Sequence, residues 1–437
     1  MSGALCIDFG TSSIRAVRRL PSGKLKPLDI GRVTRSKLDD ASIRCEIHVD
    51  EHRRNVRYGD RAVIARKDTG TPCLYESSPK LWLKEPDRLG EVAAPGLSLT
   101  RENLLTGLLA YAVRAAAEAD EIGESTLKSV DIRVAHPVWP VEVKSAANAA
   151  LARVCAQARQ IAFQREAVKW GTVPVATLLE HVRSAATPRR DGVDVVEPVA
   201  AAVELLPSED NIVRICAVVD VGAGTTDIGL FQSVEPDIAS SVRSKLYLMG
   251  QPVSVFKAGN QIDAIVLELI ESRAHKPSAM ALADVKARIR GIKETLFVDG
   301  FVQELGTDVQ LEDVQSHPEA KSMARAVRAE IERSVQASAA TITHWLNRPT
   351  HSISRLDLVM AGGGAAIEFL RKAIERPVEI DGKRLQVKVI NPEGRVGLNT
   401  YGASRGRMAV ALGGASIDYD ALQHEHPPVT TIRKGSL

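Results

Sequence analysis

The chain has 437 residues, of which 44% are hydrophobic, 25% are charged and only 4% are aromatic. Because a domain holds roughly 100 to 200 residues, this length predicts at least two globular units, and the average composition excludes wholesale disorder. Few aromatic side chains favour helix-covered parallel or mixed sheets over an aromatic-rich β-sandwich. Lys and Arg number 57 against 54 Asp and Glu, a net charge of +3, so nucleic-acid or anionic-membrane binding is not predicted.

The cysteines and the apolar runs indicate the cellular compartment of the protein. Five cysteines without a CxxC pair favour a reducing compartment over a disulfide framework. No charge-free apolar run approaches the roughly 18 residues of a transmembrane helix. The apolar run at 5–7 is too short for the core of a signal peptide. We therefore expect a cytoplasmic protein.

The chain begins with predicted strands. Apolar runs at 4–9 and 14–20 flank a Gly/Ser/Thr turn at 10–13, and a third strand is expected over 25–33. The next stretch, 34–100, is more polar and is punctuated by Gly and Pro. We interpret it as a small subdomain inserted into the first lobe.

Helical patterns follow. Thr100 is placed to cap a helix that runs to residue 119, although Asn103 gives only a partial capping box. Residues 130–135 have the pattern of a buried strand, and the Ala-rich stretch 141–190 predicts an extended helical segment. A short helix over 198–206 has Pro in its first turn, where the missing N–H costs nothing.

The second half alternates in the same way. Strands are predicted at 215–219 and 228–231 around a Gly/Thr turn, followed by helices over 262–297 and 318–346. A further strand at 356–360 leads into three consecutive glycines. The polar end of the chain, with two adjacent prolines, predicts a loose tail.

Together these elements predict two lobes. The first lobe is assigned to 1–205 and contains the inserted subdomain at 34–100. The second is assigned to 206–415, with a small subdomain inserted over 245–318. The polar tail is assigned to 416–437.

An internal repeat is the most informative feature. The segment IDFGTSSI at 7–14 recurs loosely as VDVGAGTTDI at 219–228, half a chain later. One such turn alone would be an ordinary hairpin, but its bared N–H groups can also cradle phosphate oxygens. A carboxylate at the end of the strand then requires a cation, for which Mg²⁺ is the natural candidate. Two such turns on facing lobes would clamp one metal–polyphosphate unit.

Three further sites are candidates, each with a simpler alternative. Three glycines at 362–364 allow close backbone approach to a ligand, although a turn before a helix needs them equally. Glu197 begins a helix of small side chains, where it could orient water or merely complement the helix dipole. Lys80 could reach a phosphate, but taken alone a surface lysine is the simpler interpretation.

The motifs occur in an order that is more specific than any one of them. The matching segments are 7–11, 58–62, 78–81, 134–139, 197–202, 220–227, 258–263, 360–364, 391–393 and 401–403. In this order they resemble the nucleotide-binding domain of the 70-kilodalton heat-shock (DnaK-type) chaperones, in the actin and sugar-kinase superfamily. The resemblance implies an α/β, actin-like ATPase fold. In that fold two related lobes, each a ribonuclease-H-like mixed sheet, surround a nucleotide cleft.

The resemblance also implies a Mg²⁺-dependent hydrolysis of ATP to ADP and phosphate, at low turnover. Lys80 would assist phosphoryl transfer and Glu197 would place the water, with Asp220 and Thr225 as further catalytic residues. The metal, held mostly through water and with K⁺ possible nearby, would be bound by Asp8, Asp220 and Asp227. The nucleotide would be lined by Gly10, Thr11, Ser12, Gly222, Ala223, Gly224, Thr225, Gly259, Lys293, Gly362, Gly363 and Gly364.

The sequence departs from the family at several positions. Glu294 stands where the family has an arginine beside the adenine, Ala223 replaces a glycine, and Gly364 replaces a serine. The stretch 141–196 is longer than in the family. Only about 35 residues follow Gly402, so we expect no peptide-binding domain in this chain. Nucleotide-driven closure of the lobes would then regulate a separate effector or client protein.

Two other functions stay open. The segment 219–231 fits filament-forming or scaffold proteins of the FtsA or ParM type almost as well, but Lys80 and Glu197-Pro198 argue against them. Residues 7–17 would suit a sugar kinase, but no acidic residue can be assigned to bind the sugar. We expect neither a nucleic-acid nor a membrane partner, and a homo-oligomer is possible.

Overall fold

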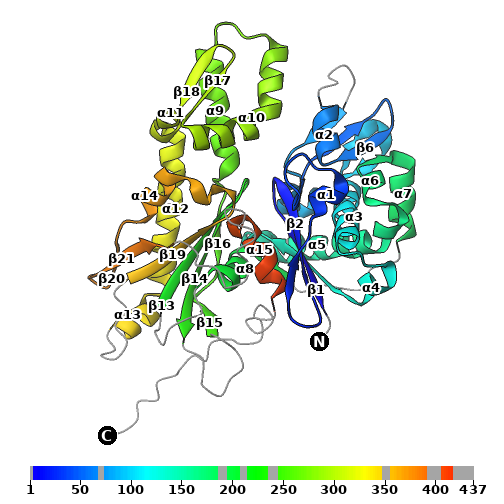
Figure 1. Ribbon diagram of the computed structural model, residues 1–437. Helices are drawn as coiled ribbons and strands as arrows, with labels where there is room; N and C mark the ends of the chain where they lie inside the picture. Colours follow the sequence, from blue (N-terminus) through cyan, green and yellow to red (C-terminus); the bar gives the residue numbers. More distant parts are fainter. Residues whose placement is uncertain are drawn as a thin grey trace.

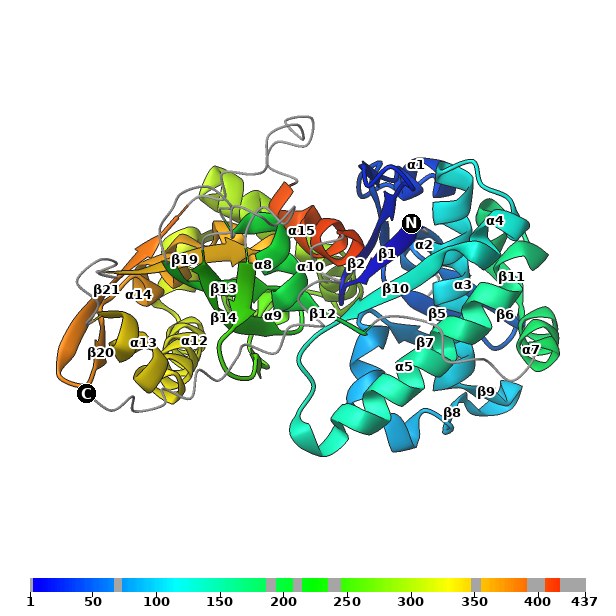
Figure 2. The ribbon, with the colours of Figure 1, turned by 90° about the horizontal axis from the view of Figure 1, so that it is seen from below.

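The computed structural model describes most of the chain. The described residues are 3–66, 73–185, 194–206, 214–234, 245–346, 355–390 and 405–416. The motif segments 391–393 and 401–403 and nearly all of the predicted tail lie outside them. The fold is mixed α/β with several sheets. Elements of the first half and of the second half form two bodies, with helices α8 (Glu197–Leu205) and α15 (Arg405–Ala415) between them (Figures 1 and 2).

The first body is built on a sheet whose central strand is β1. Its strands lie in the order β12 (Asp194–Val196), β10 (Asp131–His136), β1 (Ala4–Phe9), β2 (Ser13–Arg19) and β3 (Leu25–Pro27), and β4 (Ser42–Arg44) also pairs with β2. Strand β1 is antiparallel to β2 and parallel to β10. Its apolar side chains are fully buried, as expected for a central strand covered on both faces.

The second body repeats this arrangement around β13. The strand order is β15 (Lys245–Leu248), β14 (Thr226–Val234), β13 (Arg214–Val221), β19 (Arg355–Ala361), β21 (Lys383–Val389) and β20 (Val378–Ile380), and β16 (Val253–Val255) also pairs with β14. Strand β13 is antiparallel to β14 and parallel to β19. Asp8 lies opposite Ala135 across β1–β10, and Asp220 opposite Ala361 across β13–β19. The sequence repeat therefore corresponds to a structural repeat.

Local sequence explains the start of a long helix of the first body, α3 (Arg101–Ala119). Thr100 Oγ1 accepts from the Asn103 N–H at 3.1 Å, and Asn103 Oδ1 accepts from the Thr100 N–H at 3.2 Å. The capping box is therefore complete, whereas the sequence predicted a partial one, because an asparagine side chain reaches back as a glutamate would.

Two sequence predictions are corrected. The third strand ends at Pro27, which lacks an N–H for further pairing, and α1 (Ile30–Thr34) follows where a strand was predicted to continue. The stretch 141–190 is not helical throughout. It contains α5 (Val141–Ile161), α6 (Ala167–Trp170) and α7 (Val175–Ser184), but also β11 (Thr172–Pro174), which pairs with β6. Short strands of this kind are set by their partner rather than by local pattern.

Each body carries a smaller inserted part. The first is a sheet in the order β11, β6 (Asn55–Tyr58), β5 (Ile47–Asp50) and β7 (Cys73–Glu76), with α2 (Asp60–Ala65) and the 3₁₀ helix η1 (Pro79–Lys84). The second contains α9 (Gly259–Arg273), α10 (Ala279–Asp299) and the hairpin β17 (Phe301–Glu304) and β18 (Thr307–Gln310). Strands β15 and β16, at the start of the predicted insertion 245–318, pair with β14 in the main sheet.

The remaining helices cover the second body or complete the first. They are η2 (Pro86–Arg88), η3 (Pro95–Leu97), α4 (Glu124–Ser129), η4 (Ala162–Gln164), α11 (Leu311–Ser316), α12 (Pro318–Ala337), α13 (Ala339–Leu346), η5 (Gly363–Ala366) and α14 (Glu368–Ile374). In the part of the chain that the structure describes, no helix combines the length and the apolar character needed to span a membrane.

The two bodies are joined by an exchange of helices. Helix α8, from the first half, packs on β13 and β14, and α15, from the end of the chain, packs on β1 and β2. The two helices cross so closely that a Cβ on Gly413 would lie 1.8 Å from the carbonyl oxygen of Ala200. This crossing fixes the ends of β1 and β13, and therefore both repeated turns, near one another.

Candidate active site

The two repeated turns meet face to face. The Gly222 N–H donates to the Thr225 carbonyl at 2.9 Å and closes the second turn. A Cβ on Gly224 would lie 3.0 Å from both Cγ2 and Oγ1 of Thr11 in the first turn. A side chain at position 224 would therefore push the turns apart, which gives this glycine a positional reason.

A cavity of about 310 Å³ lies at this contact. The predicted site residues that line it are Asp8, Gly10, Thr11, Ser12, Glu197, Asp220, Gly222, Ala223, Thr225, Gly259, Lys293, Gly362, Gly363 and Gly364. The others are one contact away. Lys80 bonds to Glu197, Gly224 touches Thr11, and Asp227 accepts from Thr225 Oγ1 at 2.7 Å. The structure therefore brings together every residue that the sequence selected for the site.

The glycine run packs onto the end of β13. Gly362 has a φ of 78°, and a Cβ there would lie 2.4 Å from Asp220 Oδ1. A Cβ on Gly364 would lie 2.3 Å from Val221 Cγ1, whereas one on Gly363 would meet nothing within 4 Å. Two of the glycines are thus needed for packing, and the third leaves open space on the side of the cavity.

A buried ion pair lies at the base of the cavity. Lys80, in η1, donates from Nζ to Oε1 of Glu197, the first residue of α8. Lys80 is only 3% exposed, so the simpler interpretation of a surface lysine is wrong. Burial acts to lower the pKa of Lys80, but the Glu197 carboxylate outweighs it, so the lysine pKa is raised and the ammonium stays charged.

Three buried aspartates surround this pair, and none of them forms an ion pair with a described residue. Burial, followed by repulsion from Glu197, raises the pKa of Asp8 and that of Asp227 to about 6. The same two causes raise the pKa of Asp220 well above its ordinary value. Asp227 also accepts from the Val138 N–H at 2.9 Å, which favours its charged form. These carboxylates therefore repel one another, and a bound cation would relieve that repulsion.

The donor set fits a hydrated Mg²⁺ better than a dehydrated ion. Among the described residues, no group of three or more His, Cys, Asp or Glu side chains is arranged to hold a metal directly. Asp8 and Asp220 nevertheless line one cavity, and after burial and Glu197 the charge of Asp8 helps to raise the pKa of Asp220. Mg²⁺ retains several waters and needs only one or two carboxylates besides phosphate oxygens. These carboxylates could hold it through its water shell.

Comparison with known proteins does not place this chain in a family. No protein-family model matches it, and no curated protein does. The chemistry of the cavity is therefore inferred from its own residues.

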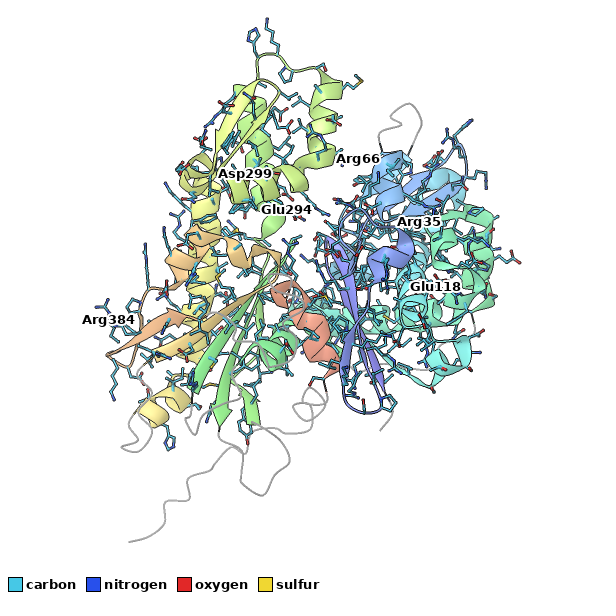
Figure 3. The ribbon with its side chains drawn as sticks, viewed as in Figure 1. Arg35, Arg66, Glu118, Glu294, Asp299 and Arg384 are labelled. Carbon is cyan, nitrogen blue, oxygen red and sulfur yellow. The ribbon has the colours of Figure 1, made fainter. Side chains whose placement is uncertain are left out.

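One face of α10 forms the opposite wall of the cavity. Lys293 Nζ bonds to Asp263 Oδ1 at 2.7 Å and to the Gly259 carbonyl at 3.1 Å, which ties α10 to the start of α9. Glu294, the next residue, and Phe297, one turn after Lys293, also line the cavity. Figure 3 shows Glu294 on α10, on the side that faces the first body. At this end the wall combines a carboxylate with an aromatic ring.

Sequence reasoning missed several residues of the cavity. Arg15, Phe297, Ile367 and Arg407 line it but were not selected. Arg15 had a usable signal, because it is the first charged residue of the strand that directly follows the first turn. Phe297 and Arg407 had none, since they lie on helices whose cavity face is decided by packing between distant segments.

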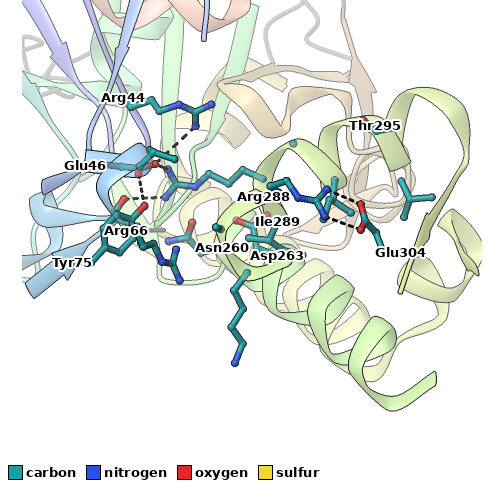
Figure 4. A pocket seen from close by; sticks show the side chains of 18 of the residues that line it. Arg44, Glu46, Arg66, Tyr75, Asn260, Asp263, Arg288, Ile289, Thr295 and Glu304 are labelled. Carbon is teal, nitrogen blue, oxygen red and sulfur yellow. Dashed lines mark hydrogen bonds and ion pairs between the residues drawn. The ribbon is translucent and has the colours of Figure 1, made fainter. Parts of the chain in front are cut away.

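A second cavity, of about 830 Å³, lies between the two inserted parts (Figure 4). Arg290 crosses it from α10 and donates to the Ser77 carbonyl at 3.0 Å and to Glu46 Oε1 at 3.3 Å. Glu46 is buried and also accepts from the Tyr75 hydroxyl. Arg290 lines both cavities. We call the cavity of about 310 Å³ the inner cavity and that of about 830 Å³ the outer cavity. The Arg290–Glu46 bridge therefore lies between the inner and the outer cavity.

Proposed function

We propose that this protein binds ATP with Mg²⁺ in the inner cavity and hydrolyses it slowly to ADP and phosphate. The observation that carries the proposal is the contact between the two repeated turns, Thr11 against Gly224, above a cavity lined by acidic residues. The repeated sheets and the crossing of α8 with α15 support an actin-like ATPase fold with two related lobes.

In this proposal, backbone N–H groups of both turns hold the phosphates, since Gly- and Ser/Thr-rich turns present several donors to one side. A bound Mg²⁺ would supply positive charge to the phosphate oxygens. Glu197 orients the attacking water, and Lys80 stabilises charge that develops on the transferred phosphoryl group. Water adds to the terminal phosphorus and the bond to the β-phosphate oxygen breaks. Phe297 and Ile367 provide apolar surface for the base.

We further propose that nucleotide binding changes how closely the two bodies approach. A ligand held by both turns binds more tightly when the bodies are closed, and this differential affinity shifts the population towards the closed form. The Arg290–Glu46 bridge is then a contact that closure makes and opening breaks. The output would pass to a separate effector or client protein, as in a chaperone cycle.

The proposal is tested by ATP turnover of the purified chain with and without Mg²⁺. We expect slow, Mg²⁺-dependent phosphate release that Lys80→Ala abolishes, whereas Lys128→Ala, at an exposed lysine, leaves it unchanged. Since breaking one side of a buried pair is strongly destabilising, the variant Lys80→Met with Glu197→Gln, which leaves no unpaired charge, serves as a second, folded variant. Wild-type protein that neither binds nor hydrolyses MgATP would refute the proposal.

The same samples distinguish the scaffold alternative. Sedimentation and electron microscopy with MgATP would reveal filaments if the chain assembles as FtsA or ParM type proteins do. Soluble particles that release phosphate favour the proposed nucleotide-dependent closure of the two bodies. Filaments without any nucleotide turnover favour the alternative.

A further inference from the structure

Arg15 occupies a special place in the repeat. In the first sheet Asp8 lies directly opposite Arg15 across β1–β2, and in the second Asp220 lies directly opposite Asp227 across β13–β14. Directly opposed residues of an antiparallel pair project on the same face, with Cβ atoms about 5 Å apart. Arg15 is therefore the first-half equivalent of Asp227, with the opposite charge.

The guanidinium of Arg15 has charged neighbours but no bonded partner. Asp8, Asp39 and Asp220 attract it and Arg407 repels it. It lines the inner cavity, and it donates no hydrogen bond to any residue within the part of the chain that the structure describes.

Most of the other cations that line the cavity are bonded: Arg44 to Asp60, Arg290 to Glu46 and Lys293 to Asp263. Arg407 also has no bonded partner among the described residues, but unlike Arg15 it is exposed. The five donors of Arg15 are therefore available to a ligand.

We propose that Arg15 is a fixed cation of the phosphate subsite and binds the terminal phosphate of the nucleotide. The inference rests on the proposed function, because it assigns a residue to that same cavity. A guanidinium keeps its charge at every physiological pH and matches two phosphate oxygens with two parallel N–H groups. Because the equivalent position in the second half is a carboxylate, the terminal phosphate lies on the side of the first turn. The site then gains positive charge that does not depend on a dissolved ion.

The test is the affinity of Arg15→Ala and Arg15→Lys for MgATP, MgADP, AMP and magnesium tripolyphosphate, measured by calorimetry. A charge-assisted hydrogen bond contributes enough for a 10- to 100-fold effect on affinity. We expect Arg15→Ala to weaken MgATP and tripolyphosphate by about this factor and AMP by less than about twofold. Arg15→Lys should recover part of the loss. Guanidinium chloride at low millimolar concentration should restore binding to Arg15→Ala and not to wild type.

Controls separate this role from a structural one. Arg53→Met, at a 60% exposed arginine, should bind all four ligands as wild type does. Equal weakening of MgATP and AMP by Arg15→Ala, or unchanged MgATP affinity, would overturn the inference. If wild type binds tripolyphosphate but not ATP, the proposed function fails while the Arg15 variants still decide the inference. If it binds neither, both fail.

Discussion

The buried aspartates make a prediction about Asp8→Asn that runs against the usual effect of changing a site residue. Asp8 is 7% exposed and accepts no hydrogen bond from the described residues, so asparagine removes its charge without breaking a bond. In the ligand-free protein that charge is poorly solvated because it is buried, and Glu197 repels it. We expect the substitution to stabilise the ligand-free protein.

The size and the pH dependence of the effect follow from the pKa. Asp8 titrates at about 6 in the folded protein, against 3.8 as its ordinary value. The folded state therefore holds the proton more tightly than the unfolded chain. Stability due to this group is full below about pH 4 and is lost as the pH rises through about 6. The loss at neutral pH is about 3 kcal/mol, which Asp8→Asn should recover.

The assay is urea unfolding of ligand-free protein at pH 7.5 and at pH 4.5, with the transition of the first body followed by the fluorescence of its tryptophans. Asp8→Asn should raise the free energy of unfolding by up to about 3 kcal/mol at pH 7.5 and by only about 1 kcal/mol at pH 4.5, where the unfolded carboxyl is already mostly ionised. Asp308→Asn, at an exposed aspartate of the β17–β18 hairpin, should change neither value. MgATP should stabilise wild type and not Asp8→Asn.

Two results would refute this reasoning. A loss of stability in Asp8→Asn at pH 7.5 would mean that the carboxylate has a stabilising partner in the empty cavity. A gain of the same size at both pH values would mean that the effect comes from packing and not from charge.

Two further predictions concern the contacts between the bodies. Arg290→Ala should speed nucleotide release several-fold in a stopped-flow chase. Adding Glu46→Gln should then have little further effect, since both substitutions remove the same bridge. Additive effects of the two substitutions would argue against a role of the bridge in holding the bodies closed. Gly413→Ala should destabilise the protein by about 3 kcal/mol or more in thermal unfolding, because its Cβ would collide with the Ala200 carbonyl. Gly406→Ala, on the same helix with no atom within 4 Å of the added Cβ, is the matched control and should be nearly neutral.

Much of the candidate site could be predicted from the sequence, because phosphate binding by a turn depends on the local backbone. The turns at 10–13 and 222–225 need small residues and a preceding aspartate wherever they occur, so the repeat was visible without any structure. The strands that precede the turns, β1 and β13, are central and buried, and they are nearly continuous apolar runs for that reason. The sequence did not predict short strands that depend on a partner distant along the chain. Strand β11 is an example, because it forms by pairing with β6.

The sequence by itself determined which residues could bind phosphate and a cation, because turn chemistry and carboxylate spacing are properties of neighbours along the chain. Only the tertiary structure decided what stands opposite them. It buried Lys80 against Glu197, 117 positions away, and set Arg15 beside Asp8 where the other half has Asp227. Long-range pairing fixes the sign of the charge at each point of the cavity, and that sign determines which ligand the cavity can hold.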